Sequence, residues 1–216
     1  MPGKQGLLAV LLLGLTQAAL CQELSANVRL IAAARAGDQA GVTRALADGA
    51  SANARSRRGE TALVIALKDG RPAIAKQMLD AGTDINLAAV NGVTPLIAAA
   101  HGGYPEIVSL LLRKGASVDA LDQLKKNAMT YAAGQGHTEI VVLLLETGVD
   151  PNAVYAHDLT ALMWAAGYGK TETVKALLAA GARPELKDDR GKTALDMARE
   201  GKYQETVTLL ESAAKS

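Results

Sequence analysis

The chain has 216 residues, enough for a domain with its own core, and hydrophobic residues make up 49% of it, which excludes a disordered polypeptide. Aromatic residues make up only 3%, so the apolar content is mostly Ala, Leu and Val, which suits helices packed closely through small side chains. The 23 Lys and Arg residues nearly balance the 22 Asp and Glu residues, which excludes a chain-wide basic field for nucleic acid or an anionic membrane.

Residues 1–21 have the pattern of a secretory signal peptide. Lys4 gives the segment a positive charge, and residues 6–20 are almost entirely apolar. That apolar stretch is too short to span a bilayer comfortably, and small residues close it. We therefore predict cleavage between Cys21 and Gln22, which leaves a mature chain without cysteine and so without a disulfide or redox-active thiol.

Three alternatives to this interpretation stay open: cleavage after Ala18, a buried N-terminal helix, and a lipid anchor on Cys21. Lipid-modified cysteines generally follow a small residue, whereas Leu20 precedes this one, which disfavours the anchor. The chain also contains no Asn-x-Ser/Thr sequon. An exported chain without cysteine or sequon is typical of the bacterial envelope, so we predict a periplasmic location.

From Ala26 onward the sequence repeats with a period of 33 residues. Written in rows of that length, one column holds alanine in every row, one holds leucine or methionine in every row, and two hold glycine in the first five rows. The alanine column is Ala33, Ala66, Ala99, Ala132, Ala165 and Ala198, and the rows span about residues 26–58, 59–91, 92–124, 125–157, 158–190 and 191–216.

Each row predicts a helix, a turn, a second helix and an extended loop. The alanine lies in the first helix, where a methyl group lets a neighbouring helix approach closely. The second helix is clearest at residues 106–113, whose apolar side chains form a wide stripe. Glycine ends both helices. No row could bury its own apolar face, so the rows must stack on one another.

The third row opens with Thr94-Pro95-Leu96 and continues with Ala98-Ala99, Gly103, Glu106-Ile107-Val108, Leu111-Leu112 and Gly115-Ala116. With the period, these residues resemble the ankyrin repeat. The resemblance covers essentially the whole predicted mature chain, residues 22–216. It implies an all-α repeat solenoid of about six helix-turn-helix repeats, with β-turn fingers projecting along one edge.

Two departures from the family's pattern stand out. The histidine that usually follows Thr-Pro-Leu is replaced by Ile, Val, Thr, Met or Asp in every row, so its hydrogen bonds must be replaced by packing or lost. The fourth row has Lys125, Asn127 and Ala128 where Gly, Thr and Pro are expected, which predicts weaker turn geometry there.

A search for catalytic or metal-binding motifs finds no convincing one. Gly169-Lys170-Thr171 imitates the end of a phosphate-binding loop, but Trp164 stands where that motif needs a glycine. The three histidines, His101, His137 and His157, lack metal-ligand spacing. No Ser, Cys or Thr lies in a recognisable nucleophile elbow. We therefore expect no enzymatic activity, no cofactor and no metal.

The resemblance implies that a partner meets the concave face, formed by the fingers and the exposed side of the first helices. Tyr131 and Trp164 share one column and should be neighbours, with Tyr168 one helical turn from Trp164. Tyr and Trp are typical interface anchors, although this column could equally be half-buried core. Arg57 and Arg58 form a basic fingertip that either suits an acidic partner or is only solvated. The predicted partner-binding residues are Tyr131, Trp164, Tyr168, Tyr155, His157, Arg57, Arg58, Lys126 and Arg190.

These observations predict a non-enzymatic protein–protein interaction module. We expect it to act as a monomer in the bacterial periplasm on an unidentified protein, with no nucleic acid partner and no membrane span in the mature chain. Bacterial proteins of this kind include immunity factors or inhibitors that block a toxin or a cell-wall hydrolase, and helpers of envelope stress defence. A secreted effector that engages host proteins and a lipid-anchored envelope scaffold remain the alternatives.

Overall fold

The computed structural model describes Gln22 and residues 25–214. The predicted signal peptide, with Cys21, lies outside the described residues, while Gln22 is helical and exposed. The chain divides into two compact units, the first ending at Leu87 and the second starting at Ala88. The assignment of residues 22–216 to one repeat domain therefore stays a prediction.

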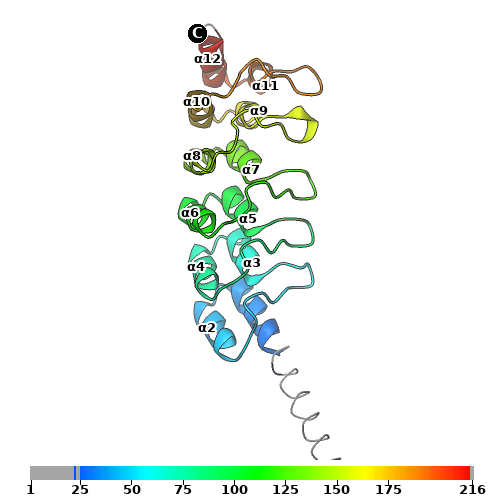
Figure 1. Cartoon of the computed structure of the whole chain (residues 1–216), viewed down its shortest axis with the longest axis vertical. Coiled ribbons are helices and arrows are strands. Elements are labelled where there is room, and N and C mark those ends of the chain that lie inside the picture. The colour runs from blue at the N-terminus through cyan, green and yellow to red at the C-terminus, as the bar shows by residue number, and fades with distance from the viewer. Residues whose placement is uncertain (1–21, 23–24, 215–216) are drawn as a thin grey trace, which may run out of the picture. The chain divides into compact units, whose positions relative to one another are not determined.

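The first unit consists of two helix pairs. A helix over residues 25–36 is followed by α2 (Gln39–Ala47), and α3 (Ala62–Lys68) is followed by α4 (Pro72–Asp80) (Figure 1). Helix α4 packs against both α3 and α2. The largest fully buried side chains of this unit are Leu30, Leu63, Leu67, Ile74, Met78 and Leu79.

The second unit repeats the same pair four times. The first helices are α5 (Pro95–Gly102), α7 (Ala128–Gln135), α9 (Ala161–Gly167) and α11 (Ala194–Glu200). The second helices are α6 (Pro105–Arg113), α8 (Thr138–Glu146), α10 (Thr171–Ala179) and α12 (Gln204–Ala213), and a single 3-10 turn, η1 (Ala156–Asp158), lies in one loop.

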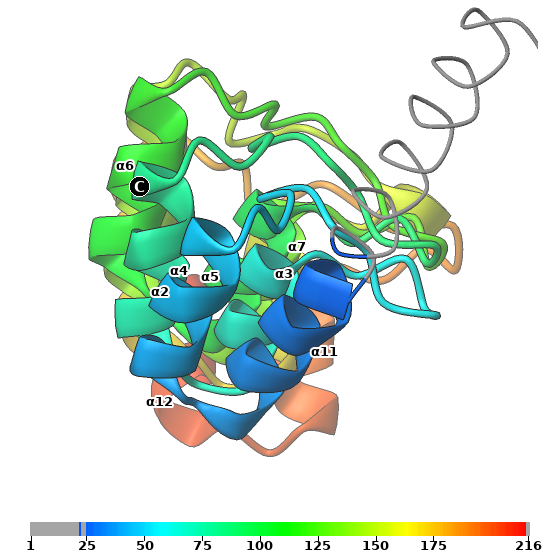
Figure 2. The ribbon, with the colours of Figure 1, turned by 90° about the horizontal axis from the view of Figure 1, so that it is seen from below.

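Helices of the same kind stack on one another in the second unit. Helix α7 packs between α5 and α9, and α9 packs on α11, while α6, α8, α10 and α12 form a parallel row. In the second unit, the loops between repeats project from the side of the first helices that faces away from the second helices (Figures 1 and 2). Among the described residues there is no strand beyond two isolated bridges, Arg55 with Thr61 and Val154 with Thr160. The helix-turn-helix solenoid predicted from the sequence is confirmed.

A polar residue begins each first helix from α3 to α11. The hydroxyl of Thr94 accepts the backbone N–H of Ile97, three residues on, at 3.2 Å. This bond satisfies one of the amide groups that a helix N-terminus leaves free. Thr61, Thr160 and Thr193 do the same for α3, α9 and α11, and Asn127 does so for α7. The threonine column is therefore a column of helix caps.

The turn between the two helices explains why glycine recurs there. Gly103 has a φ of 75°, which is left-handed backbone that side chains rarely adopt. A Cβ built on Gly103 would also lie 2.6 Å from the ring of His137, which belongs to the next repeat. The His137 ring nitrogen Nε2 lies 3.1 Å from the carbonyl oxygen of His101. The turns at Gly37, Gly103, Gly136 and Gly169 are thus each covered by a side chain of the following repeat, which leaves no space for a Cβ at the glycine.

The fourth row keeps its turn despite lacking the expected glycine. The N–H of Asp122 donates to the carbonyl of Lys126 at 2.9 Å, and the corresponding bond closes the other fingers at 2.8–3.0 Å. The predicted weakening of this turn is therefore wrong as far as hydrogen bonds are concerned. The departure is found in the backbone instead, because Lys125 takes a φ of 57°. Asn127 replaces the threonine cap without loss, since its side chain accepts the Thr130 N–H at 3.0 Å.

Candidate protein-binding surface

Four rings gather in the second unit, three from the neighbouring helices α5, α7 and α9 and one from the residue that ends α9, and we call them the aromatic cluster: His101, Tyr131, Trp164 and Tyr168. The ring of Tyr168 stacks on that of Trp164 with centroids 6.0 Å apart and planes 7° apart. The His101 ring meets Tyr131 edge-on, with centroids 5.1 Å apart. The 33-residue spacing places Tyr131 and Trp164 in one column, and the helix turn brings Tyr168 over Trp164.

Lys126 joins the two halves of the aromatic cluster. Its ammonium nitrogen lies 4.2 Å from the centroid of the Trp164 ring and 5.5 Å from that of Tyr131. Both distances are within the range of cation–π attraction. A cationic side chain of the finger therefore contacts both rings of the aromatic column, which the spacing of residues along the sequence did not predict.

Tyr131 is partly a structural residue. Its hydroxyl donates to the buried carboxylate of Asp122 at 2.7 Å, and the other oxygen of Asp122 accepts the N–H groups of Leu124 and Lys126. Burial, followed by the bond to Asp122 and its charge, raises the pKa of the Tyr131 phenol well above its usual value. Tyr131 and Trp164 are half-buried, as expected if this column belongs partly to the core, and their contact with a partner stays a prediction.

Tyr168 is the exposed member of the aromatic cluster, with 53% of its surface accessible. Beside it lies a groove of about 400 Å3, which we call the aromatic groove. Its lining includes Leu159, Met163, Trp164, Tyr168, Arg190 and Met197. The indole nitrogen of Trp164 is buried and has no hydrogen-bond partner among the described residues.

Arg190 lies at the rim of the aromatic groove and is held there by its own finger. Its Nε and Nη2 donate to one oxygen of Asp188 at 2.9 and 2.7 Å. The other oxygen of Asp188 accepts the backbone N–H groups of Arg190 and Lys192. Burial alone would raise the pKa of the Asp188 carboxyl, but the hydrogen bonds from Lys192 and Arg190 outweigh it and lower that pKa.

Tyr155 and His157, two further predicted contacts, lie on the finger that contains η1. Tyr155 is half-buried; burial raises the pKa of its phenol, and a hydrogen bond with Asn127 acts in the opposite sense. His157 is exposed, and its Nδ1 lies 2.8 Å from a carboxylate oxygen of Asp189 on the next finger. Within the described residues, no ring contact joins either of them to the aromatic cluster.

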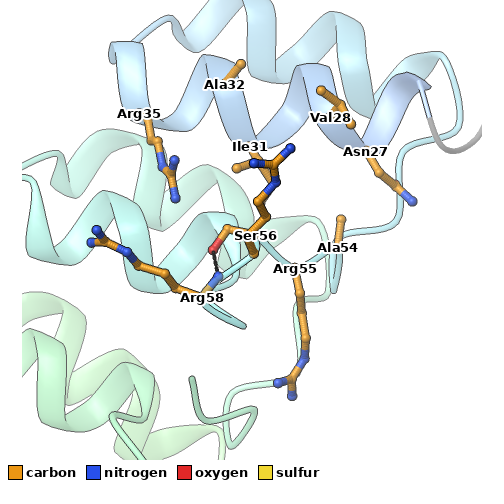
Figure 3. A pocket seen from close by; sticks show the side chains of 10 residues that line it. Asn27, Val28, Ile31, Ala32, Arg35, Ala54, Arg55, Ser56 and Arg58 are labelled. Atoms are coloured by element: carbon orange, nitrogen blue, oxygen red, sulfur yellow. Dashed lines mark hydrogen bonds between the residues drawn. The ribbon is translucent and has the colours of Figure 1, made fainter. Parts of the chain in front are cut away.

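Arg57 and Arg58 belong to the first unit, so they are separate from the aromatic cluster. Both are exposed and line a larger groove of about 930 Å3 (Figure 3). Sequence reasoning missed the exposed aliphatic side chains on the fingers of the second unit, namely Val90, Leu121, Leu124 and Val154. A signal for them was present, because Leu121 and Val154 occupy the same column of the repeat.

The structure adds two observations about other kinds of site. No group of three His, Cys, Asp or Glu side chains with metal-binding geometry is found in the part of the chain that the structure describes. In the same part, no helix is long and apolar enough to cross a membrane.

Comparison with known proteins identifies the repeat. A family model described as ankyrin repeats (3 copies) matches residues 74–155 and 154–215, which together are more than half of the chain. No curated protein matches the sequence significantly. Ankyrin-repeat proteins are generally non-enzymatic modules that bind other proteins, so the repeats indicate a protein–protein interaction module with a protein partner. The period, the capped first helices, the glycine turns and this match lead to one conclusion: the chain belongs to the ankyrin-repeat family.

Proposed function

We propose that this chain is a non-enzymatic binding protein of the bacterial periplasm and that it holds a protein partner on the aromatic cluster of its second unit. The observation that carries the binding surface is Tyr168, half of whose surface is exposed while its ring stacks on Trp164. A ring already fixed by stacking loses little conformational freedom when a partner covers it. Tyr and Trp are also the side chains that most often dominate interface energetics.

The surroundings of Tyr168 suit a protein contact. The aromatic groove supplies Met197 and Leu159 for apolar contact, and Arg190 supplies a fixed guanidinium at its rim. Interfaces favour this combination of an aromatic and aliphatic centre with arginine. Because Arg190 is already oriented by Asp188, its donors are in place before a partner arrives.

A pull-down from periplasmic extract tests the surface. Wild-type protein is compared with Tyr168→Ala and with Val142→Ala, which removes an exposed side chain of α8 on the second-helix row. We expect wild type and Val142→Ala to capture the same protein, and Tyr168→Ala to bind it about thirtyfold more weakly, since a hot-spot residue contributes about 2 kcal/mol. Tyr131 and Trp164 are unsuitable probes because they are half-buried. Equal capture by folded Tyr168→Ala, checked by circular dichroism, would refute this surface.

The periplasmic location is supported by the signal-peptide pattern of residues 1–21 and by the lack of cysteine after Cys21. Fractionation of cells that produce a C-terminally tagged chain tests it. A shortened chain in the periplasm is expected. Appearance in the medium would favour a secreted effector, and incorporation of labelled fatty acid would favour a lipid-anchored scaffold on Cys21.

Within the periplasm, a role as an immunity factor or inhibitor is the sharpest form of this proposal. A solenoid acts by covering its partner, so we expect the captured protein to be an enzyme or toxin whose activity falls on binding. Titrating the purified chain into an assay of that partner decides the point, because an adaptor for envelope stress defence would leave the activity unchanged.

A further inference from the structure

A second groove lies in the first unit, between the helix over residues 25–36 and the finger that follows α2. We call it the basic groove; its volume is about 930 Å3. Its lining is Asn27, Val28, Ile31, Ala32, Arg35, Ala54, Arg55, Ser56, Arg57 and Arg58 (Figure 3). A volume of this size lies in the range of grooves that hold a ligand.

The floor of the basic groove is aliphatic. Val28, Ile31 and Ala32 lie on one face of the helix, because residues three and four apart are neighbours on a helix surface. Val28 has 70% of its surface exposed, and Ile31 is half-buried. A single exposed valine has no special meaning, but here it lies inside a concave site and not on a convex surface.

The rim of the groove carries arginines without a close ion pair, although the Glu60 carboxylate attracts Arg35 and Arg58 at longer range. Neither guanidinium of Arg57 and Arg58 forms an ion pair with a carboxylate of the described residues. Arg35 has only a long contact, 3.5 Å, with Glu60, whose other oxygen is taken by Lys68 at 2.6 Å. Arg55 is different, since its guanidinium points away from the hollow in Figure 3 and lies 3.5 Å from the Gly59 carbonyl.

Comparison with a later finger shows why Arg58 is unpaired. Arg190 occupies the same repeat position as Arg58, and Asp188 holds it through two hydrogen bonds. The residue of the first unit that corresponds to Asp188 is Ser56, whose hydroxyl accepts the N–H groups of Arg58 and Glu60. The serine reproduces the backbone bonds of the aspartate but not its charge. The finger therefore keeps its shape, and its Arg58 guanidinium is not held by a hydrogen-bonded carboxylate as that of Arg190 is.

The charge of the whole first unit acts in the same direction. Residues 25–87 contain nine Lys and Arg against six Asp and Glu, whereas residues 88–214 contain twelve against fifteen. The near-zero charge of the chain thus conceals a basic first unit. A positive potential around a groove raises the local concentration of an anionic ligand and speeds its association.

We propose that the basic groove binds an acidic segment of a partner protein, with an aliphatic side chain on the floor formed by Val28 and Ile31 and carboxylates on Arg57 and Arg58. Guanidinium groups match the planar carboxylate through paired N–H donors. A nucleic acid fits less well, because no aromatic side chain lines the groove to stack a base. A flat membrane surface fits less well than a segment that can enter the hollow. The basic groove lies in a different unit from the aromatic cluster and has a different chemistry. A test of the basic groove therefore does not depend on whether the aromatic cluster binds a partner.

Selection from a random library of short displayed peptides tests the proposal and does not require an identified partner. The library is panned on the immobilised full chain, and the enriched sequences are compared with those obtained on Arg57→Gln/Arg58→Gln. Both arginines are exposed, so the double variant is expected to fold normally. Enrichment of Asp and Glu around Leu, Ile or Val on wild type, lost on the double variant, is the expected result.

The affinity of an enriched peptide is then measured by fluorescence anisotropy. We expect Arg57→Gln/Arg58→Gln to weaken binding about tenfold and Val28→Ser about threefold, with binding falling as salt increases. Arg113→Gln, an exposed arginine on α6, serves as the control and should bind as wild type does. Enrichment without acidic residues, or binding that survives the double variant, would overturn the proposal. Flotation with phosphatidylglycerol vesicles that depends on Arg57 and Arg58, without peptide enrichment, would overturn it in favour of a membrane surface.

Discussion

Lys125 holds a backbone conformation that glycine holds at the same position of two other fingers. Its φ is 57°, while Gly92 and Gly191 have φ values of 79° and 77°. A side chain in this region costs about 1 kcal/mol, because its Cβ crowds the backbone. The hydrogen bonds of the turn hold Lys125 in place against that cost.

We therefore expect Lys125→Gly to raise the free energy of unfolding by about 0.5 kcal/mol, since relief of strain is partly offset by the greater freedom of glycine in the unfolded chain. Urea unfolding followed by circular dichroism measures this. Gly92→Ala is the matched control and should destabilise, because its Cβ would lie 2.9 Å from the Cα of Asp122. A loss of stability in Lys125→Gly would show that its side chain matters more than its backbone.

Tyr131 links a buried carboxylate to the aromatic cluster through one hydroxyl. Tyr131→Phe keeps the ring beneath Lys126 but removes the donor to Asp122, so we expect it to lower the free energy of unfolding by about 1.5 kcal/mol at neutral pH. The pKa of this phenol is raised in the folded state above its ordinary value of 10.0. A raised pKa means that the contribution is complete below pH 10 and is lost as pH rises through the folded pKa.

The stability difference between wild type and Tyr131→Phe should thus be constant from neutral pH to about pH 10 and shrink above it. Urea unfolding at a series of pH values checks this prediction. A difference that does not change up to the most alkaline pH at which the protein folds would mean that packing of the ring, and not the hydroxyl, carries the effect.

At the scale of elements, the repeat period predicted the helices and their glycine turns because each depends on one residue type at a fixed position. Gly103 ends α5 with a left-handed turn, as the columns indicate, whereas the cap that Thr94 provides at the start of α5 was not predicted. The contacts that shape the candidate sites depend on side-chain conformation instead. The Lys126 ammonium lies over Trp164, and the Arg190 guanidinium binds Asp188. Both contacts join different columns of the repeat, and the spacing of residues does not determine which conformation a long, flexible cationic side chain adopts.

The finger over residues 188–192 is built around one carboxylate, so it offers a test of how fingers hold their shape. Asp188→Asn keeps one acceptor but loses the charge on which Arg190 and two backbone N–H groups converge. We expect the variant to unfold at a lower urea concentration than wild type at neutral pH. Ser56→Ala, which removes the corresponding hydroxyl in the first unit, should cost less because a neutral acceptor forms weaker bonds.

The pH dependence of Asp188→Asn follows from the lowered pKa of Asp188. A lowered carboxyl pKa gives stability that is present above the ordinary value of 3.8 and is lost as pH falls through the folded pKa. The gap between wild type and Asp188→Asn should accordingly narrow in acid. A gap that persists at the lowest pH at which both proteins fold would indicate that shape, and not charge, makes the finger.

At the scale of the whole molecule, composition gave a correct but incomplete account of charge. The net charge of +1 excluded a chain-wide basic field, yet the first unit is basic and the second acidic. The two candidate surfaces follow this division, because the basic groove lies in the first unit and the aromatic cluster in the second. The difference in charge becomes visible only when the chain is divided at Leu87 and Ala88, a boundary that the columns of the repeat do not mark.

The two units also differ in what they should do alone. A helix pair cannot bury its own apolar face, and about three stacked repeats are needed before a solenoid is stable. Residues 88–214 contain four pairs, with Leu96, Leu111, Met129 and Ile140 fully buried, whereas residues 25–87 contain two. We therefore expect residues 88–216 to unfold cooperatively in urea as an isolated chain, and residues 22–87 to show weak helical circular dichroism with no cooperative transition. If residues 22–87 unfold cooperatively, two helix pairs are enough for a stable fold, and the basic groove can be studied in that fragment. If residues 88–216 fail to fold, the stability of this solenoid depends on the full set of repeats.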